Sequence, residues 1–123
     1  VLFRPHAELL SDADGWLRRN FSGLIGDPEF RRDVLLVVTF DENDTPWSRY
    51  GWDEDNKVFA VFFGDDVIPG RKEHALYTHY DLLRTIETIH DIKPMASGDR
   101  KARVIRGIWQ QPPGHASLTK SCN

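Results

Sequence analysis

The chain has 123 residues, a usual size for one domain, and its 16 Lys and Arg against 19 Asp and Glu give a formal net charge of -3. The basic residues are scattered along the sequence, which argues against nucleic acid as the main partner. No apolar stretch approaches the roughly 20 residues that a membrane-spanning helix needs. Cys122 is the single cysteine, so it can form a disulfide only with another chain or with a segment outside this one.

The first predicted element is a helix that begins at a capping box, in which Ser11 is followed three residues later by Asp14. Apolar residues then recur at helical spacing, namely Trp16, Leu17, Phe21, Leu24 and Ile25. The sequence Gly26-Asp27-Pro28 is a helix stop signal, so we expect the helix to end there.

Two apolar runs, residues 34–40 and 58–63, predict two strands. Both runs are apolar at nearly every position, which is typical of strands buried on both faces of a parallel α/β sheet. The segment between them, residues 41–56, is polar and predicts a loop.

A second helix is predicted from a capping box formed by Thr78 and Asp81. Its apolar face carries Leu82, Leu83, Ile86 and Ile89, and it should end near residues 93 and 94. On the same helix, Arg84 is expected to pair with Glu87 or Asp81. The predicted core of the domain is residues 11–93, and residues 94–123 are expected to form an irregular tail.

Two strands are fewer than a stable α/β sheet needs. A two-stranded sheet would leave long unpaired edges and could not cover both faces of such apolar strands. We therefore expect residues 1–123 to be part of a larger, mostly parallel sheet with flanking helices, whose other strands lie outside this chain segment.

A cluster of carboxylates follows the first strand directly, as Asp41, Glu42, Asn43 and Asp44. In α/β sheets, ligands bind beyond the carboxyl ends of the strands, and crowded oxygen ligands suit a divalent cation. The alternative is a polar loop whose Asp and Asn side chains cap its own turn.

Several sequence blocks occur in the order found in the phosphoesterase family: residues 13–17, 34–44, 58–64, 67–70 and 78–87. The most specific are the strand that ends in Thr-Phe-Asp-Glu and the helix His-Tyr-Asp-Leu-Leu-Arg-Thr-Ile-Glu. The chain thus resembles the C-terminal part of this family, which includes secreted acid phosphatases and non-haemolytic phospholipases C. The family is similar to alkaline phosphatase in fold and consists of α/β metallohydrolases.

The resemblance implies that the hydroxyl nucleophile and further metal ligands lie in an N-terminal part of the protein that is not in this sequence. The first residue is Val1 instead of methionine, which fits an internal start. That missing part is the expected partner, together with a phosphate-ester substrate.

The family pattern also implies roles for individual residues. Asp41 matches an acidic metal ligand, and Glu42 matches the acid beside it, which holds the metal or the bound phosphate. Asn43 and Asp44 would orient Asp41. We expect a divalent metal ion, whose identity the sequence does not specify, and we expect Asp41→Asn to abolish metal binding and hydrolysis.

Two histidines are candidate catalytic residues. His6 lies where related sequences place a phosphate-contacting histidine, and the alternative is a surface histidine near a chain end. His79 matches a recurrent histidine of the family at a helix N-terminus, where anions bind favourably. It would either line the site or form a hydrogen bond to the strand-end acids.

The loop aromatics Trp47, Tyr50 and Trp52 could shape a substrate entrance, but packing of the loop is the more common role of such residues. The triplets that begin at Asn20 and Asn43 permit N-glycosylation in a secreted glycoprotein. A glycan on Asn43 would block the candidate site, so we expect that triplet to be unused.

The leading functional hypothesis is a secreted, extracellular, metal-dependent phosphoric ester hydrolase that resembles acid phosphatases more than phospholipases C. The alternative is a non-catalytic secreted fragment or ligand-binding protein that keeps the fold, because no nucleophile is identified in this chain.

Overall fold

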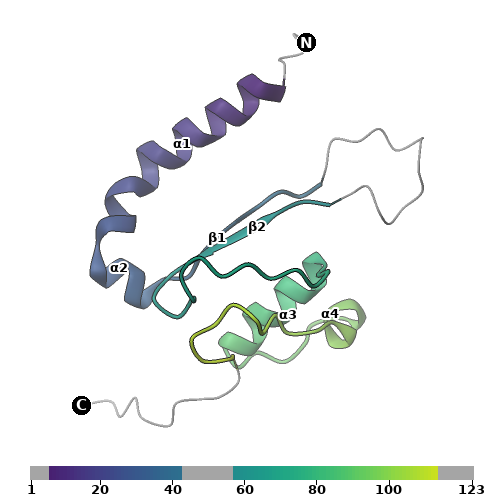
Figure 1. Ribbon diagram of the computed structural model, residues 1–123. Helices are drawn as coiled ribbons and strands as arrows, with labels where there is room; N and C mark the ends of the chain where they lie inside the picture. The colour runs from purple at the N-terminus through teal and green to yellow at the C-terminus, as the bar shows by residue number, and fades with distance from the viewer. Residues whose placement is uncertain (1–5, 43–56, 114–123) are drawn as a thin grey trace. The chain divides into compact units, whose positions relative to one another are not determined.

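The computed structural model describes residues 6–42 and 57–113. The chain divides into two compact units, Val1–Asp65 and Asp66–Asn123. Within the described residues, the first unit contains two helices and two strands, and the second contains two helices (Figure 1). No helix in these ranges is long and apolar enough to cross a membrane.

Helix α1 (His6–Gly26) is longer than predicted, because it begins at His6 and not at Ser11. Ser11 therefore lies inside the helix and does not cap it. The preceding residues Ala7 to Leu10 have high helix propensity, which extends the helix toward the N-terminus. Its predicted end at Gly26 is confirmed.

Helix α2 (Pro28–Asp33) was not predicted, because Gly26-Asp27-Pro28 was interpreted only as a stop signal. Asp27 is its N-cap residue, and the Asp27 Oδ1 atom accepts a hydrogen bond of 2.8 Å from the Glu29 N–H. Pro28 occupies the start of the helix, where its fixed φ angle is favourable and its missing N–H costs nothing. The same three residues thus end one helix and begin the next.

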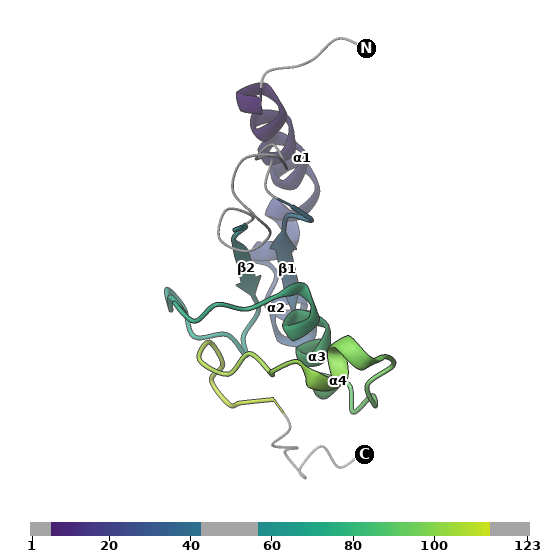
Figure 2. The ribbon, with the colours of Figure 1, turned by 90° about the vertical axis from the view of Figure 1, so that its right-hand side faces the viewer.

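Strands β1 (Leu36–Thr39) and β2 (Ala60–Phe63) lie side by side as a two-stranded antiparallel sheet (Figures 1 and 2). Leu36 pairs with Phe63, and Thr39 pairs with Ala60. An α/β architecture is confirmed, but the described residues contain no parallel pair. A parallel pair needs a crossover connection, usually a helix, and the segment that joins these strands has no helical pattern.

The strands are also less buried than the sequence indicated. All of β1 is half-buried, whereas Phe59 and Val61 are 58% and 52% exposed. At one end of the sheet, the Thr39 hydroxyl donates a hydrogen bond of 2.9 Å to the Phe59 carbonyl. The Phe40 and Phe59 rings pack edge to face at 5.0 Å between centroids. These contacts join the two strands at the end of β1, where the carboxylates follow.

In the second unit, helix α3 (His79–Ile89) begins at the predicted capping box. Helix α4 (Ser97–Lys101) and the buried residues Ile105, Ile108 and Trp109 then lie in the segment that was expected to be an irregular tail. The structure differs from that expectation in α4 and in these buried residues, whereas residues 102–113 form no helix or strand apart from one isolated bridge at Trp109.

The segment around Trp109 is held by backbone hydrogen bonds to residues more than 35 positions earlier. The Ile68 N–H donates to the Ile108 carbonyl and the Gln110 N–H donates to the Asp66 carbonyl, each at 2.8 Å. Val67 and Trp109 form an antiparallel bridge between these two bonds. The buried apolar residues of the second unit are therefore fixed by long-range contacts.

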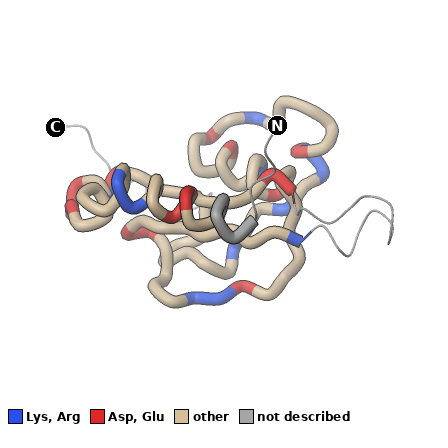
Figure 3. The backbone as a smooth tube through the Cα atoms, turned by 90° about the horizontal axis from the view of Figure 1, so that it is seen from above, with Lys and Arg blue, Asp and Glu red and all other residues tan. Residues whose placement is uncertain are grey.

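Acidic and basic positions are interspersed along the described backbone (Figure 3). At the end of α2, for example, Arg32 Nη2 lies 2.9 Å from Asp33 Oδ2, and both side chains are exposed. Exposed ion pairs of this kind contribute little to stability, because water screens them. Exposed ion pairs of this kind are therefore a minor contribution to the stability of either unit.

Candidate functional site

Asp41 and Glu42 follow the end of β1 after one residue, Phe40, and both side chains are exposed. The Glu42 N–H donates a hydrogen bond of 3.0 Å to the Asp41 Oδ1 atom. This bond joins neighbouring residues, whereas the turn-capping interpretation predicts a bond to the backbone two residues further on. The hydrogen bond uses one of the two carboxylate oxygens of Asp41 and restricts the position of that carboxylate near the end of β1.

The chemistry of these two side chains fits a divalent cation, since both offer hard oxygen ligands. Two adjacent carboxylates do not complete a coordination shell. Among residues 6–42 and 57–113, no group of three or more His, Cys, Asp or Glu residues could hold a metal ion. Asp41 and Glu42 would therefore need further ligands to complete a metal site.

His79 is the first residue of α3 and its side chain is exposed. The positive end of the helix dipole and the N–H groups of the first turn make this a favourable place for an anion. His79 belongs to the second unit, whereas Asp41 and Glu42 belong to the first.

The other candidate residues are placed less fully. His6 is the first residue of α1. Asn43, Asp44 and the loop aromatics Trp47, Tyr50 and Trp52 lie outside the described residues, as does Cys122. Asn20 lies on α1, where its side-chain amide donates a hydrogen bond of 2.8 Å to the Trp16 carbonyl.

Arg84 and Glu87 form an ion pair on α3, with 3.4 Å between Arg84 Nη1 and Glu87 Oε2. This confirms one of the two pairings predicted for Arg84. Glu87 is only 2% exposed, so its carboxyl group is part of the interior of the second unit.

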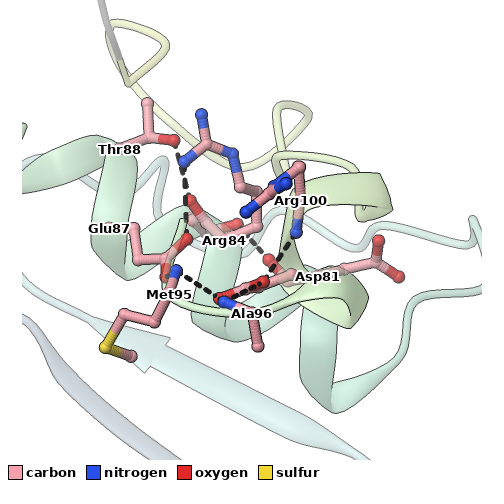
Figure 4. A network of polar contacts seen from close by, with 9 residues as sticks. Asp81, Arg84, Glu87, Thr88, Met95, Ala96 and Arg100 are labelled. Carbon is pink, nitrogen blue, oxygen red and sulfur yellow. Dashed lines mark hydrogen bonds and ion pairs between the residues drawn. The ribbon is translucent and has the colours of Figure 1, made fainter. Parts of the chain in front are cut away.

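The sequence interpretation missed a buried polar cluster around Glu87 (Figure 4). Its other buried members are Asp81, Thr85 and Asp99. Thr85 joins α3 to the following segment, because its hydroxyl donates to the Asp81 carbonyl at 2.7 Å and accepts the Ile105 N–H at 2.9 Å. The capping motif identified Asp81, but no local pattern links it to residues beyond 95.

Hydrogen bonds hold the pKa of Asp81 and Asp99 below the usual range. Burial alone would raise the pKa of Asp81, but the Arg103 N–H and the Thr78 N–H and hydroxyl outweigh it. Burial likewise opposes ionisation of Asp99, and hydrogen bonds from the N–H groups of Ala96, Met95 and Arg100 again lower its pKa. Both groups are therefore stabilised as carboxylates inside the second unit.

The model of one protein family, described as Phosphoesterase family, matches residues 5–93 of the chain. This is well over half of the sequence. The chain belongs to the Phosphoesterase family. The match includes all the residues predicted for the site from the sequence, which are His6, Asp41, Glu42 and His79.

Individual proteins similar to this family member are acid phosphatases. A probable acid phosphatase of Kluyveromyces lactis is 31% identical over 103 residues, which is 81% of this chain and 23% of that protein. An acid phosphatase of Aspergillus fumigatus is 26% identical over 73% of this chain and 20% of its own length. A phosphate-repressible acid phosphatase of Penicillium chrysogenum is 25% identical over 84% of this chain and 24% of its own length.

The chain thus spans between a fifth and a quarter of these relatives. No solved structure matches it significantly. The family assignment therefore rests on sequence, and the structure supplies the local geometry of the candidate residues.

Proposed function

We propose that this chain is part of a metal-dependent phosphoric ester hydrolase that acts on phosphomonoesters, as an acid phosphatase does. The observation that carries the proposal is the position of Asp41 and Glu42 just beyond the end of β1, after Phe40, within the segment that matches the Phosphoesterase family. The names of the relatives favour a phosphomonoesterase over a phospholipase C.

In this proposal, Asp41 is a metal ligand, and Glu42 holds the metal or the bound phosphate. When bound, a divalent cation would neutralise phosphoryl oxygens as charge moves in the transition state. The hydrogen bond from the Glu42 N–H restricts the orientation of the Asp41 carboxylate. Less conformational entropy would then be lost when the carboxylate binds an ion.

His79 and His6 are proposed to act on the phosphate group. At the start of α3, a protonated His79 together with the helix N–H groups would bind a phosphate oxygen or protonate the leaving group. His6, at the start of α1, is proposed to contact the phosphate.

The hydroxyl nucleophile and the remaining metal ligands are proposed to lie in protein sequence outside this chain, since the relatives are four to five times longer than the segment matched. The same missing part would supply the strands that complete a mostly parallel, alkaline-phosphatase-like sheet. An antiparallel pair such as β1 and β2 is compatible with the edge of such a sheet. We further propose that the protein is secreted, as the resemblance to secreted acid phosphatases implies.

The metal site can be tested with Asp41→Asn and a matched variant, Asp65→Asn. Asp65 is also exposed and follows the other strand, but the register places it at the opposite end of the sheet from Asp41. Its ion pair with Arg31, at 3.6 Å, is exposed and contributes little. Titration of the purified protein with Mn²⁺ should show weakened binding in Asp41→Asn and unchanged binding in Asp65→Asn. Hydrolysis of an aryl phosphate should likewise fall in Asp41→Asn and stay at the wild-type rate in Asp65→Asn.

Equal Mn²⁺ binding in both variants and the wild type would contradict the role of Asp41. A protein that binds phosphate esters but hydrolyses none, even with added metal and the complete gene product, would favour the non-catalytic alternative.

A further inference from the structure

Asp81 uses its two carboxylate oxygens for two different partners. Its Oδ2 atom accepts hydrogen bonds from the Thr78 N–H at 2.7 Å and the Thr78 hydroxyl at 3.0 Å. Its Oδ1 atom accepts a hydrogen bond of 2.6 Å from the N–H of Arg103, 22 residues later in the chain. A helix cap requires only the first set of bonds.

Arg103 also holds the residues that precede the helix. Its guanidinium donates a hydrogen bond to the Leu76 carbonyl and lies 5.1 Å from the centre of the Tyr77 ring. Arg103 therefore contacts both sides of the helix start, with its side chain before Thr78 and its backbone at Asp81. We call these five residues, Leu76, Tyr77, Thr78, Asp81 and Arg103, the clamp.

His79 lies between the two ends of the clamp, directly after Thr78 and two residues before Asp81. Its backbone is therefore fixed on both sides by residues that are themselves tied to Arg103. Asp81 is only 5% exposed, and a buried carboxylate is tolerated only where hydrogen bonds compensate its lost hydration. The clamp thus couples the start of α3 to a segment beyond the family match, which ends at residue 93.

We propose that Asp81 and Arg103 are positioning residues, which fix the first turn of α3 so that His79 meets the phosphate group in one orientation. This inference rests on the role proposed above for His79. It adds that the orientation of His79 depends on the segment after α4 and not on the helix cap alone.

The test is a double-mutant cycle between Asp81→Asn and His79→Ala, measured as aryl phosphate hydrolysis by the protein in its active form. An asparagine has one acceptor oxygen, so it cannot serve both Thr78 and Arg103, although it fills the same volume. The matched control is Thr85→Val, which removes the bond to the Ile105 N–H and the bond to the Asp81 carbonyl but leaves the contacts of the Asp81 carboxylate with Thr78 and Arg103 in place.

We expect Asp81→Asn to lower kcat about tenfold or more with little change in KM, because small misplacements of a catalytic group are costly. In the His79→Ala background, Asp81→Asn should cause no further loss. Thr85→Val should keep the wild-type kcat. A loss from Asp81→Asn that is equal in both backgrounds, or no loss at all, would overturn the positioning role.

The same kcat measurements distinguish a wrong catalytic role for His79 from a wrong positioning role for Asp81. Wild-type kcat in His79→Ala would refute the catalytic role of His79, whereas a large loss there combined with wild-type kcat in Asp81→Asn would refute only the clamp.

A second measurement does not depend on activity. The NMR signals of the His79 imidazole in the purified chain should shift in Asp81→Asn and in Arg103→Met, which removes the contacts with Leu76 and Tyr77. They should stay in place in Thr85→Val. Unchanged signals in both clamp variants would overturn the inference, and Arg103→Met keeps the test decisive if Asp81→Asn does not fold.

Discussion

Glu87 and Asp99 accept hydrogen bonds from the same donor, the Met95 N–H, which lies 3.4 Å from Glu87 Oε1 and 2.9 Å from Asp99 Oδ2. Both carboxyl groups are buried, and the Glu87 side chain also forms a hydrogen bond to Asp99. Figure 4 shows Glu87 of α3 next to Met95 and Ala96 of the segment that leads into α4. The second unit thus joins its two helices through buried acids.

These buried acids predict an acid-sensitive second unit. The pKa values of Asp81 and Asp99 are lower in the folded chain than in the unfolded chain. Their contribution to stability is therefore present above the unfolded value, about pH 4, and is lost as the pH falls below it toward the folded values. Urea denaturation of the wild type should show a falling free energy of unfolding over that range.

Asp99→Asn should show a weaker dependence on pH over the same range, because it removes one of the carboxyl groups whose pKa is lower in the folded chain. An unchanged pH dependence in this variant would contradict the assignment of the acid sensitivity to Asp99.

Thr85→Val should destabilise the second unit by about 1–3 kcal/mol, because it leaves the buried Ile105 N–H without its acceptor. The matched control is Thr88→Val on the same helix. The Thr88 hydroxyl only donates back to the Arg84 carbonyl, at 2.7 Å, and its loss should have a small effect. Chemical denaturation followed by circular dichroism measures both. An equal loss of unfolding free energy in the two variants would show that the bond to the Ile105 N–H does not stabilise the second unit.

Trp109→Ala should be among the most destabilising substitutions, at about 3–5 kcal/mol, because Trp109 is 5% exposed and packs in the small apolar core. Its indole N–H also donates to the Ile105 carbonyl at 2.6 Å. Trp16→Ala is the control, since Trp16 is 54% exposed on α1 and should cost much less. Similar losses for both would contradict the assignment of the core to residues 105–109.

Gly64→Ala and Gly23→Ala should change the stability of the first unit in opposite directions. A Cβ atom at Gly64 would lie 2.9 Å from the Val34 carbonyl oxygen, closer than real contacts allow, so the backbone must move. A Cβ atom at Gly23 meets nothing within 4 Å, and alanine in a helix is favoured by about 0.5–1 kcal/mol over glycine. Thermal unfolding measures both. Stabilisation by Gly64→Ala would contradict the close approach of the β2 end to Val34.

The elements that could be predicted from the sequence are those with local signals. The Thr78 and Asp81 side chains form the predicted capping box, and both strands lie within the apolar runs. Helix α2 has a local signal too, since Asp27 and Pro28 are typical of a helix start, but the same residues are typical of a helix end.

The parts that could not be predicted depend on distant residues. The Asp81 carboxylate meets the Arg103 backbone across 22 positions, and no spacing rule indicates this. Ile105, Ile108 and Trp109 are buried, but they lie next to the glycine-rich and proline-rich segment 107–114, which led to the interpretation as a tail.

The candidate site is predictable only in part for the same reason. The structure places Asp41 and Glu42 one residue beyond the end of a strand, close to where the apolar run before them indicated. Their roles, and those of His6 and His79, remain predictions. A metal site needs more ligands than Asp41 and Glu42, and the described residues contain no group of three or more His, Cys, Asp or Glu that could hold a metal ion.

The central claim, that this family member takes part in metal-dependent phosphoester hydrolysis, is tested most directly by aryl phosphate hydrolysis across acidic to neutral pH, with and without a chelator. We predict activity that the chelator abolishes and that an added divalent metal restores. Activity that is insensitive to the chelator would contradict the metal dependence, and no hydrolysis by the complete protein at any pH with metal present would contradict the enzymatic function itself.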